Sequence, residues 1–353
     1  MAVPGILLFY CSANVMNTNK MLKQTAIVIT SIASPTKAVR KYADLDSTKT
    51  IVVGDTKTPD NWHLENVIYL SVEQQLELFK DFGSRLPVAH YSRKNIGYLE
   101  AIRRGYQVIV DTDDDNIPLE NWYIPDRDGV ILSSLRDQGF INIYSYFTDQ
   151  HIWPRGLPLD CVQSEQARAF RNHLEEKNLS VPIWQGLANG DADVDAIYRL
   201  VNDSPCVFES RVPVALGIGT VSPYNSQNTI SYKEAFPLLY LPSHVSFRFT
   251  DILRGLIGQV ILWDHDYRLG FFKATVFQER NIHDYFNDFK DEIPVYLNTR
   301  NVIEIAQATI SSGQSMQQQL SDIYRALAKE NIVGPGENEL VDLWLNELDK
   351  LDL

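Results

Sequence analysis

The first 120 residues alternate between short apolar runs and stretches with helical spacing, and this alternation constrains the fold more than any other feature. Four runs rich in β-branched residues show no polar alternation, as expected of strands buried on both faces: residues 26–30, 50–54, 67–70 and 107–111. Helix-like stretches lie between them, at residues 35–44, 71–82 and 92–104. This pattern predicts an α/β fold with a parallel, doubly wound sheet, whose ligands bind beyond the carboxyl ends of the strands.

Composition excludes several classes of protein. The 353 residues include 32 Lys and Arg against 45 Asp and Glu, a net charge of -13 that argues against nucleic acid as a partner. The three cysteines are far apart, which excludes a disulfide framework and a Cys-based zinc site. No apolar run reaches the roughly 18 residues of a membrane span, and the N-terminal GILLFYCSANVM has no basic segment before it. We therefore expect a soluble, cytoplasmic protein.

Four carboxylates fall within five positions of the stretch VIVDTDDDNIP (residues 108–118). With an extended backbone, Asp111, Asp113 and Asp115 point to one side and Asp114 to the other. Oxygen ligands without sulfur favour Mg²⁺ or Mn²⁺, which bind few protein carboxylates and complete their coordination with water and substrate phosphate oxygens. The loop predicts a cation site at Asp113 and Asp115, with a solvated acidic turn as the alternative.

A basic segment, HYSRKNIGYLEAIRRG (residues 90–105), lies just upstream. Ser92 is the expected N-cap of its helix, and Arg93, Lys94 and Asn95 follow in the first turn. Cations are unfavourable at a helix N-terminus, so their presence there indicates a negative ligand. We interpret this turn as the binding site of a diphosphate, shared with the cation of the acidic loop. A basic surface patch is the alternative.

The order and spacing of these segments, N-x-G-x-x-x-A-x-x-x-G followed by a hydrophobic strand and an Asp-x-Asp, resemble the nucleotide-sugar half of GT-A fold glycosyltransferases. The chain is similar to the STELLO-type glycosyltransferases of plants and their relatives. Six segments in order carry this resemblance: RKNIGYLEAIRRG, DTDDDNIP, IWPRGLPL, GDADVDAIYRL, PYNSQNT and FRFTDILRGLIGQVILW. A weaker likeness extends to the UDP-arabinopyranose mutases, although Asn116 stands where those relatives carry Cys.

The resemblance implies roles for four later residues. Arg155 matches the arginine that becomes glycosylated in the mutase-like family; we favour a conventional role, as a donor to sugar hydroxyls or phosphate, because a protonated guanidinium is a poor nucleophile. Asp191 and Asp193 are candidates to bind the hydroxyls of a hexose or pentose, with helix capping as the alternative for Asp193 or Asp195. Asp251 stands where many inverting GT-A enzymes keep their general base; its alternative is a favourable interaction with the helix dipole.

The nucleotide end of the site is predicted by analogy with GT-A donors. The candidates for hydrogen bonds to the base and ribose are Thr30, Ser31, Asp55 and Asp113. His265 and His283 are considered as a third metal ligand, although a lone His is more often structural. The candidates to stack on sugar faces are Trp184, Tyr224 and Trp263.

After about residue 300 the helical period continues in three segments, at residues 302–308, 315–328 and 338–351. We expect a GT-A-like catalytic domain at residues 1–300 and a C-terminal helical extension at residues 301–353. Packing of this extension onto the catalytic domain is the first expectation. Pairing with a second copy, which would make the protein a homo-oligomer, is the other.

Together these features predict a GT-A-like (Rossmann-like) α/β enzyme. It would use Mn²⁺ or Mg²⁺ to transfer a sugar from a nucleotide-diphosphate donor, UDP-linked by analogy, to a glycan or another hydroxyl acceptor. One alternative is a mutase that interconverts pyranose and furanose forms of the nucleotide sugar. Another is a catalytically inactive scaffold that binds nucleotide or a partner, which the intact DTDDD motif and Asp251 argue against.

Overall fold

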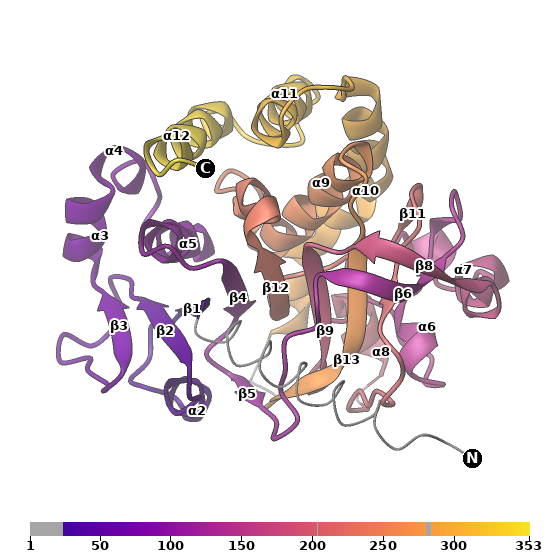
Figure 1. The fold of residues 1–353 in the computed structure, drawn as a ribbon, viewed down its shortest axis with the longest axis horizontal. Helices are drawn as coiled ribbons and strands as arrows, with labels where there is room; N and C mark the ends of the chain where they lie inside the picture. The colour runs from indigo at the N-terminus through magenta and orange to yellow at the C-terminus, as the bar shows by residue number, and fades with distance from the viewer. Residues whose placement is uncertain (1–23, 203, 280–283) are drawn as a thin grey trace, which may run out of the picture.

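One mixed β-sheet organises the molecule (Figure 1). The computed structural model describes residues 24–202, 204–279 and 284–353. The strands are β1 (Thr25–Thr30), β2 (Thr48–Val53), β3 (Val67–Leu70), β4 (Val108–Thr112), β5 (Asn116–Pro118), β6 (Asp128–Ser134), β7 (Gly139–Phe140), β8 (Leu174–Ser180), β9 (Ile183–Gly190), β10 (Val214–Ala215), β11 (Thr220–Val221), β12 (Asn228–Tyr232) and β13 (Leu269–Gln278). The main sheet has the order β3-β2-β1-β4-β12-β9-β13-β10-β6-β8, with β5 paired to β13, and β7 pairs with β11 separately.

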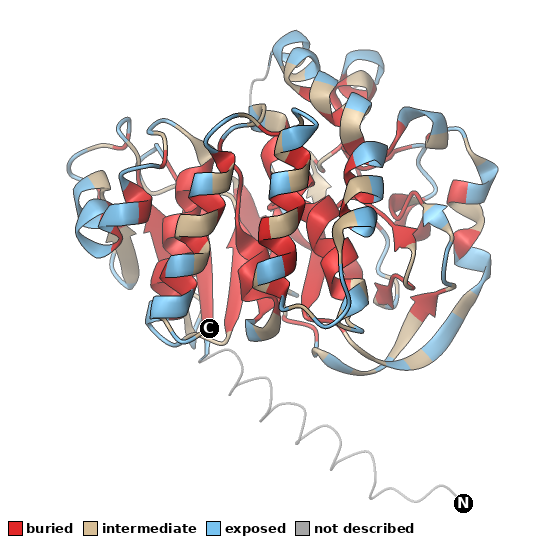
Figure 2. Ribbon diagram, turned by 90° about the horizontal axis from the view of Figure 1, so that it is seen from above, coloured by how far each residue is buried: buried red, intermediate tan, exposed pale blue. Residues whose placement is uncertain are grey.

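Helices cover both faces of this sheet. They are α2 (Lys37–Ala43), α3 (Val72–Leu78), α4 (Lys80–Gly83), α5 (Lys94–Arg103), α6 (Tyr144–Phe147), α7 (Glu165–Ala169), α8 (Ala196–Val201), α9 (Thr250–Asp264), α10 (Tyr285–Thr309), α11 (Met316–Lys329) and α12 (Glu337–Lys350). Short 3-10 turns include η1 (Tyr91–Arg93), η4 (Lys233–Leu239) and η5 (Phe247–Phe249). The helices turn their buried sides toward the strands (Figure 2).

The N-terminal strands form the predicted parallel, doubly wound unit. Strands β3, β2, β1 and β4 are all parallel neighbours. Helix α5 lies close against one face, because a Cβ atom at Gly97 would stand 2.5 Å from Val28 and 2.7 Å from Val53. Helix α2 covers the opposite face, where Val39 and Tyr42 join the second apolar cluster. The α/β prediction is confirmed in this half.

The remaining strands depart from an all-parallel sheet. Strand β12 is antiparallel to both β4 and β9, and β13 is parallel to β9 but antiparallel to β10. The apolar runs alone did not predict this direction, because strand direction is set by the connections. Thr229 pairs with Asp111, so the antiparallel β12 begins beside the carboxyl end of β4. The segment before β12 is thereby brought next to the acidic loop.

The C-terminal helices pack onto the rest of the chain. Helix α10 contacts α8, α9 and η5, α11 contacts α9 and η4, and α12 contacts α4. The predicted helix at residues 302–308 is the end of α10, which starts earlier because Asp284 caps it and Pro294 is accommodated inside it. A domain boundary at residue 300 would thus fall within α10.

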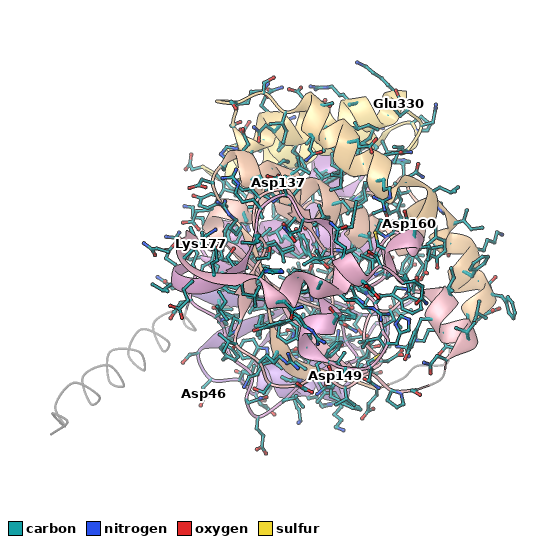
Figure 3. The ribbon with its side chains drawn as sticks, turned by 90° about the vertical axis from the view of Figure 1, so that its right-hand side faces the viewer. Asp46, Asp137, Asp149, Asp160, Lys177 and Glu330 are labelled. Carbon is teal, nitrogen blue, oxygen red and sulfur yellow. The ribbon has the colours of Figure 1, made fainter. Side chains whose placement is uncertain are left out.

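The outer surface of the molecule carries the charged side chains of Asp137, Asp149 and Lys177 (Figure 3). In the described parts of the chain, none of the helices combines the length and apolar character needed to cross a bilayer.

Candidate active site

Two adjoining cavities lie at the carboxyl ends of β1, β2 and β4. The large cavity has a volume of about 320 Å³ and contains most of the predicted carboxylates. The small cavity, of about 230 Å³, lies over the end of β2. Four residues line both: Thr30, Tyr91, Asp114 and Phe247. The two cavities therefore form one cleft, at the place where a doubly wound sheet binds its ligands.

Two buried cations, Lys94 and Arg254, form ion pairs with Asp111 just before the acidic loop. Asp111 is fully buried and forms ion pairs with Lys94 at 2.6 Å and with Arg254 at 2.9 Å. Lys94 also contacts Asp113 at 3.0 Å, which confirms that these two aspartates point to the same side. Asp114 turns the other way and accepts a hydrogen bond from Ser31 at 2.5 Å. The opposite directions of Asp113 and Asp114 are as predicted, but the backbone is not extended beyond Thr112, because residues 114–115 form a turn closed by a bond from Asn116 N to Asp113 O at 3.3 Å.

The carboxylates of this loop hold protons more tightly than usual. Burial raises the pKa of Asp113 to about 7; Lys94 opposes the shift, and the charges of Asp115 and Asp111 add to it. Burial is also the main cause of the raised pKa values of Asp114 and Asp115. A nearby cation would favour the ionised forms of all three.

The donor set suits a cation that takes few protein ligands. Within the described residues, no group of three His, Cys, Asp or Glu side chains is arranged to hold a metal ion. Asp113 and Asp115 both line the large cavity, and their charges influence each other. Mg²⁺ and Mn²⁺ need only one or two carboxylates when water and phosphate oxygens supply the rest. These two residues therefore fit such a cation with a diphosphate, and do not form a complete protein cage.

The basic turn does not present its side chains as predicted. Lys94 is fully buried. Its ammonium donates to Thr112 O at 2.7 Å and to Tyr91 Oη at 3.1 Å, and it also contacts the acidic loop. Burial lowers its pKa, but Asp111 and Asp113 outweigh this effect and raise it overall, so the ammonium stays charged. Its assignment to a diphosphate is wrong, because it supports the acidic loop from inside.

Its neighbours are also engaged. The Asn95 side chain donates to Leu241 O and accepts from Leu241 N, both at 2.8 Å, so its assignment to the ligand is wrong too. Arg93 is buried, but it lines the small cavity rather than the phosphate end of the cleft. The expected N-cap, Ser92, lies inside η1, and His90 caps that turn by accepting from Ser92 N.

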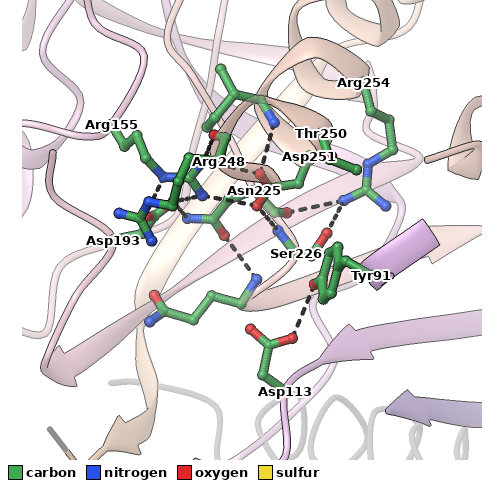
Figure 4. A network of polar contacts seen from close by, with 12 residues as sticks. Tyr91, Asp113, Arg155, Asp193, Asn225, Ser226, Arg248, Thr250, Asp251 and Arg254 are labelled. Atoms are coloured by element: carbon green, nitrogen blue, oxygen red, sulfur yellow. Dashed lines mark hydrogen bonds and ion pairs between the residues drawn. The ribbon is translucent and has the colours of Figure 1, made fainter. Parts of the chain in front are cut away.

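Arg155 is the centre of a buried charge network (Figure 4). Its guanidinium donates to both oxygens of Asp193, at 2.7 and 2.8 Å, and to both oxygens of Asp251, at 3.1 and 3.0 Å. It also donates to the backbone oxygen of Arg248. Burial lowers the pKa of Arg155, but the two carboxylates raise it far above its ordinary value. The guanidinium is therefore a fixed cation and a poor nucleophile.

Asp251 is fully committed to internal hydrogen bonds. Besides the two bonds from Arg155, its Oδ1 accepts from Ile252 N at 3.0 Å and its Oδ2 from Ser226 N at 3.2 Å. A carboxylate has about four acceptor directions, and these four bonds fill them. Burial raises the pKa of Asp251, but Arg155 and Arg254 outweigh it and lower the pKa. In this arrangement Asp251 is ill-suited to remove a proton, contrary to the predicted role as general base.

The other carboxylates of GDADVDA have separate roles. Asp195 caps helix α8 by accepting a hydrogen bond from Tyr198 N at 2.8 Å, which is one of the alternatives predicted from the sequence. Asp193 is bound by Arg155 and by Asn225 Nδ2 at 2.7 Å. Asp191 lines the large cavity and forms an ion pair with Arg199 at 2.5 Å. Asp191 therefore keeps the most capacity to accept hydrogen bonds from a ligand.

Three of the four predicted nucleotide residues line the small cavity, and the fourth, Asp113, lines only the large one. Thr30, Ser31 and Asp55 all border the small cavity. The Asp55 carboxylate already accepts from Ala89 N at 2.9 Å and His90 N at 3.1 Å, so it shapes the cavity wall.

The structure tests one of the two histidines considered as metal ligands. His265 follows the C-terminal end of α9, bonded to Gln319 at 3.1 Å. Asp251 lies at the other end of that helix, and a helix of 15 residues is about 22 Å long. The assignment of His265 is therefore wrong. His283 lies outside the described residues.

Several cleft residues were missed by sequence reasoning. Phe247, 54% exposed, and Tyr91 line both cavities, with ring centroids 5.8 Å apart. The predicted aromatic residues Trp184 and Tyr224 are instead buried in the core. Other missed residues are Arg199, Asn225, Gln227, Arg248 and Gln278. Several lie in segments that carried the family resemblance, and this was the only available signal.

The architecture and the cleft define the class of protein. A mixed α/β sheet with an acidic loop after β4 and helices at the C-terminus is the fold expected of a GT-A-like glycosyltransferase. Residues 248–353, which include α9 and the C-terminal helices, match the family model described as STELLO glycosyltransferases. Over these residues the chain is similar to the STELLO glycosyltransferases.

A comparison over most of this chain agrees with this match. Two proteins of Arabidopsis thaliana, "Probable glycosyltransferase STELLO1" and "Probable glycosyltransferase STELLO2", are each 28% identical to this chain over 341 residues. The aligned region covers 91% of this chain and 44% of each relative. The resemblance predicted from the motifs is confirmed. The chain spans less than half the length of these curated relatives.

Proposed function

We propose that this protein transfers a sugar from a nucleotide-diphosphate donor, a UDP-sugar, to a hydroxyl acceptor with the help of Mn²⁺ or Mg²⁺. The observation that carries the proposal is the cluster of Asp113, Asp114 and Asp115 between two joined cavities. Burial raises the pKa of all three carboxyl groups, so a cation at this place would favour their ionised forms. A cation bound there would neutralise the diphosphate that departs.

Other parts of the cleft would bind the nucleoside, the sugar and the acceptor hydroxyl. The small cavity would take the nucleoside, and the large cavity the sugar and the acceptor hydroxyl. Asp191 is the carboxylate to which we assign binding of a hydroxyl and removal of its proton. Asp251 and Asp193 would hold Arg155 rigid in the wall at the sugar end, where its N–H donors are taken by these two carboxylates and by the backbone oxygen of Arg248, so the predicted role of Arg155 as a donor to the sugar or phosphate is not kept in this arrangement.

The mutase alternative is weakened by Arg155. A glycosylated arginine would have to act as a nucleophile, and this guanidinium is buried between two carboxylates with its pKa raised. The scaffold alternative would bind nucleotide in the same cleft, and transfer of the sugar to an acceptor distinguishes the enzyme from it.

Calorimetric titration of UDP tests the donor site. We expect binding with Mn²⁺ and no measurable heat with a chelator. Asp115→Asn should abolish the metal-dependent binding, and the control Asp266→Asn, on an exposed turn, should retain it. No binding of UDP by the folded wild-type protein in either condition would reject the proposal. Isomerised nucleotide sugar appearing without an acceptor would instead select the mutase.

A further inference from the structure

The small cavity contains a buried cation with an unused donor. Arg93 is 1% exposed and lines this cavity. Its Nε donates to Gln75 Oε1 at 2.8 Å and its Nη1 to Leu86 O at 3.3 Å. Within the described residues its Nη2 has no hydrogen-bond partner, and the charge of Asp55 acts on the guanidinium through space. A buried charged donor left unsatisfied is costly, so an acceptor on a ligand is the expected partner.

The anchor of Arg93 fixes where this donor lies. Gln75 Nε2 donates to Gly54 O at 2.8 Å and to Leu70 O at 2.9 Å, at the carboxyl ends of β2 and β3. The acidic loop follows β4, which is two strands from β2 and three from β3. With neighbouring strands about 4.8 Å apart, the ends of β2 and β3 lie roughly 10–14 Å from the end of β4. Arg93 lines only the small cavity, whereas Asp113 and Asp115 line only the large one, so we place the nucleobase beside Arg93 and the diphosphate beside the two aspartates.

The chemistry of the guanidinium selects among bases. Arginine donates hydrogen bonds and never accepts them. At the edge of the base away from the sugar, uracil presents a carbonyl oxygen, whereas cytosine presents an amino group, which is itself a donor. The other walls near this position are largely apolar, from Ile32, Val53, Ala89 and Phe247, as suits a flat ring.

We infer that Arg93 is the residue that selects the nucleobase, by donating from Nη2 to the distal carbonyl oxygen of uracil. This inference rests on the proposed function, and it replaces the predicted contact of Arg93 with the diphosphate. Gln75 acts as its positioning residue, because its amide is fixed by two backbone carbonyls and accepts from Arg93 Nε.

The test compares UDP with CDP, which differ at the distal group of the base. With Mn²⁺ present, wild-type protein should bind CDP at least about tenfold more weakly than UDP. Arg93→Met should weaken UDP by about tenfold and bring the two nucleotides within about twofold of each other. Its affinity for inorganic pyrophosphate with Mn²⁺ should stay unchanged. The matched control is Arg85→Met, at a 62% exposed side chain, which should alter none of these affinities.

Three outcomes would overturn the inference. If the wild-type protein binds UDP and CDP equally, the inference is rejected. This result needs no variant, so it can be obtained even if Arg93→Met does not fold. If Arg93→Met folds but loses affinity for pyrophosphate, Arg93 contacts the diphosphate and not the base. Both results leave the donor site intact, whereas a wild-type protein that binds neither UDP nor pyrophosphate would remove the proposed function as well.

Discussion

Arg155 and Asp251 are 96 residues apart in the sequence and share two hydrogen bonds, at 3.1 and 3.0 Å, in the buried wall of the cleft. Asp193 binds the same guanidinium from the other side. One cation thus joins the loop after β9, the start of α9 and the loop that carries Arg155. A residue that looked like a solitary donor in the sequence is the link between three parts of the site.

Removal of this link should destabilise the fold. Arg155→Met would leave Asp193 and Asp251 as buried carboxylates without their cation, which should lower the free energy of unfolding by about 3–5 kcal/mol. Arg300→Met is the control, because Arg300 pairs with Asp160 on the exposed surface and should matter by less than about 1 kcal/mol. Urea denaturation measures both. Equal, small effects would show that the buried network contributes little.

The assignment of the proton acceptor separates Asp191 from Asp251. Asp191→Asn should lower kcat by at least about a hundredfold while the Kd for UDP stays the same, because the proton acceptor is lost and the donor contacts remain. Asp251→Asn should mainly reduce the unfolding free energy, because it breaks the bonds to Arg155. Steady-state kinetics combined with thermal denaturation tests this. A stable but inactive Asp251→Asn beside an active Asp191→Asn would restore Asp251 as the base.

Binding of the cation should depend on pH through Asp113. Its pKa of about 7 in the folded protein lies above the ordinary value of 3.8. Between these values the folded protein keeps a proton that the unfolded chain has released, so a rise in pH through this window removes stability. Mn²⁺ competes with that proton, and its affinity should therefore increase from pH 5.5 to about 7 and then level off. Calorimetry of the wild-type protein across this range measures the profile, and an affinity that does not change between pH 5.5 and about 7 would contradict the prediction.

The C-terminal helices should be required for a stable cleft. Glu337, fully buried at the start of α12, accepts from Ser243 N at 3.1 Å and from His244 N at 2.7 Å. Glu337→Gln would replace one of its two acceptor oxygens with an amide donor among these donors, and we expect a loss of at least about 2 kcal/mol in unfolding free energy. Glu339→Gln, on the same helix with a 56% exposed side chain, should cost less than about 1 kcal/mol. A neutral Glu337→Gln would mean that the helix is held by apolar packing alone.

The sequence alone determined the features that depend on neighbouring residues. Apolar runs and helical spacing predicted β1 to β4 with their helices, and the acidic loop was placed correctly at the end of β4, because periodicity and loop chemistry are local properties. It did not reveal which side chains the fold would bury. Lys94 and Asn95 read as a ligand-binding turn, yet contacts with β4 and Leu241 turn them inward. Long-range packing decides such partners, so only the tertiary structure placed Asp251 against Arg155.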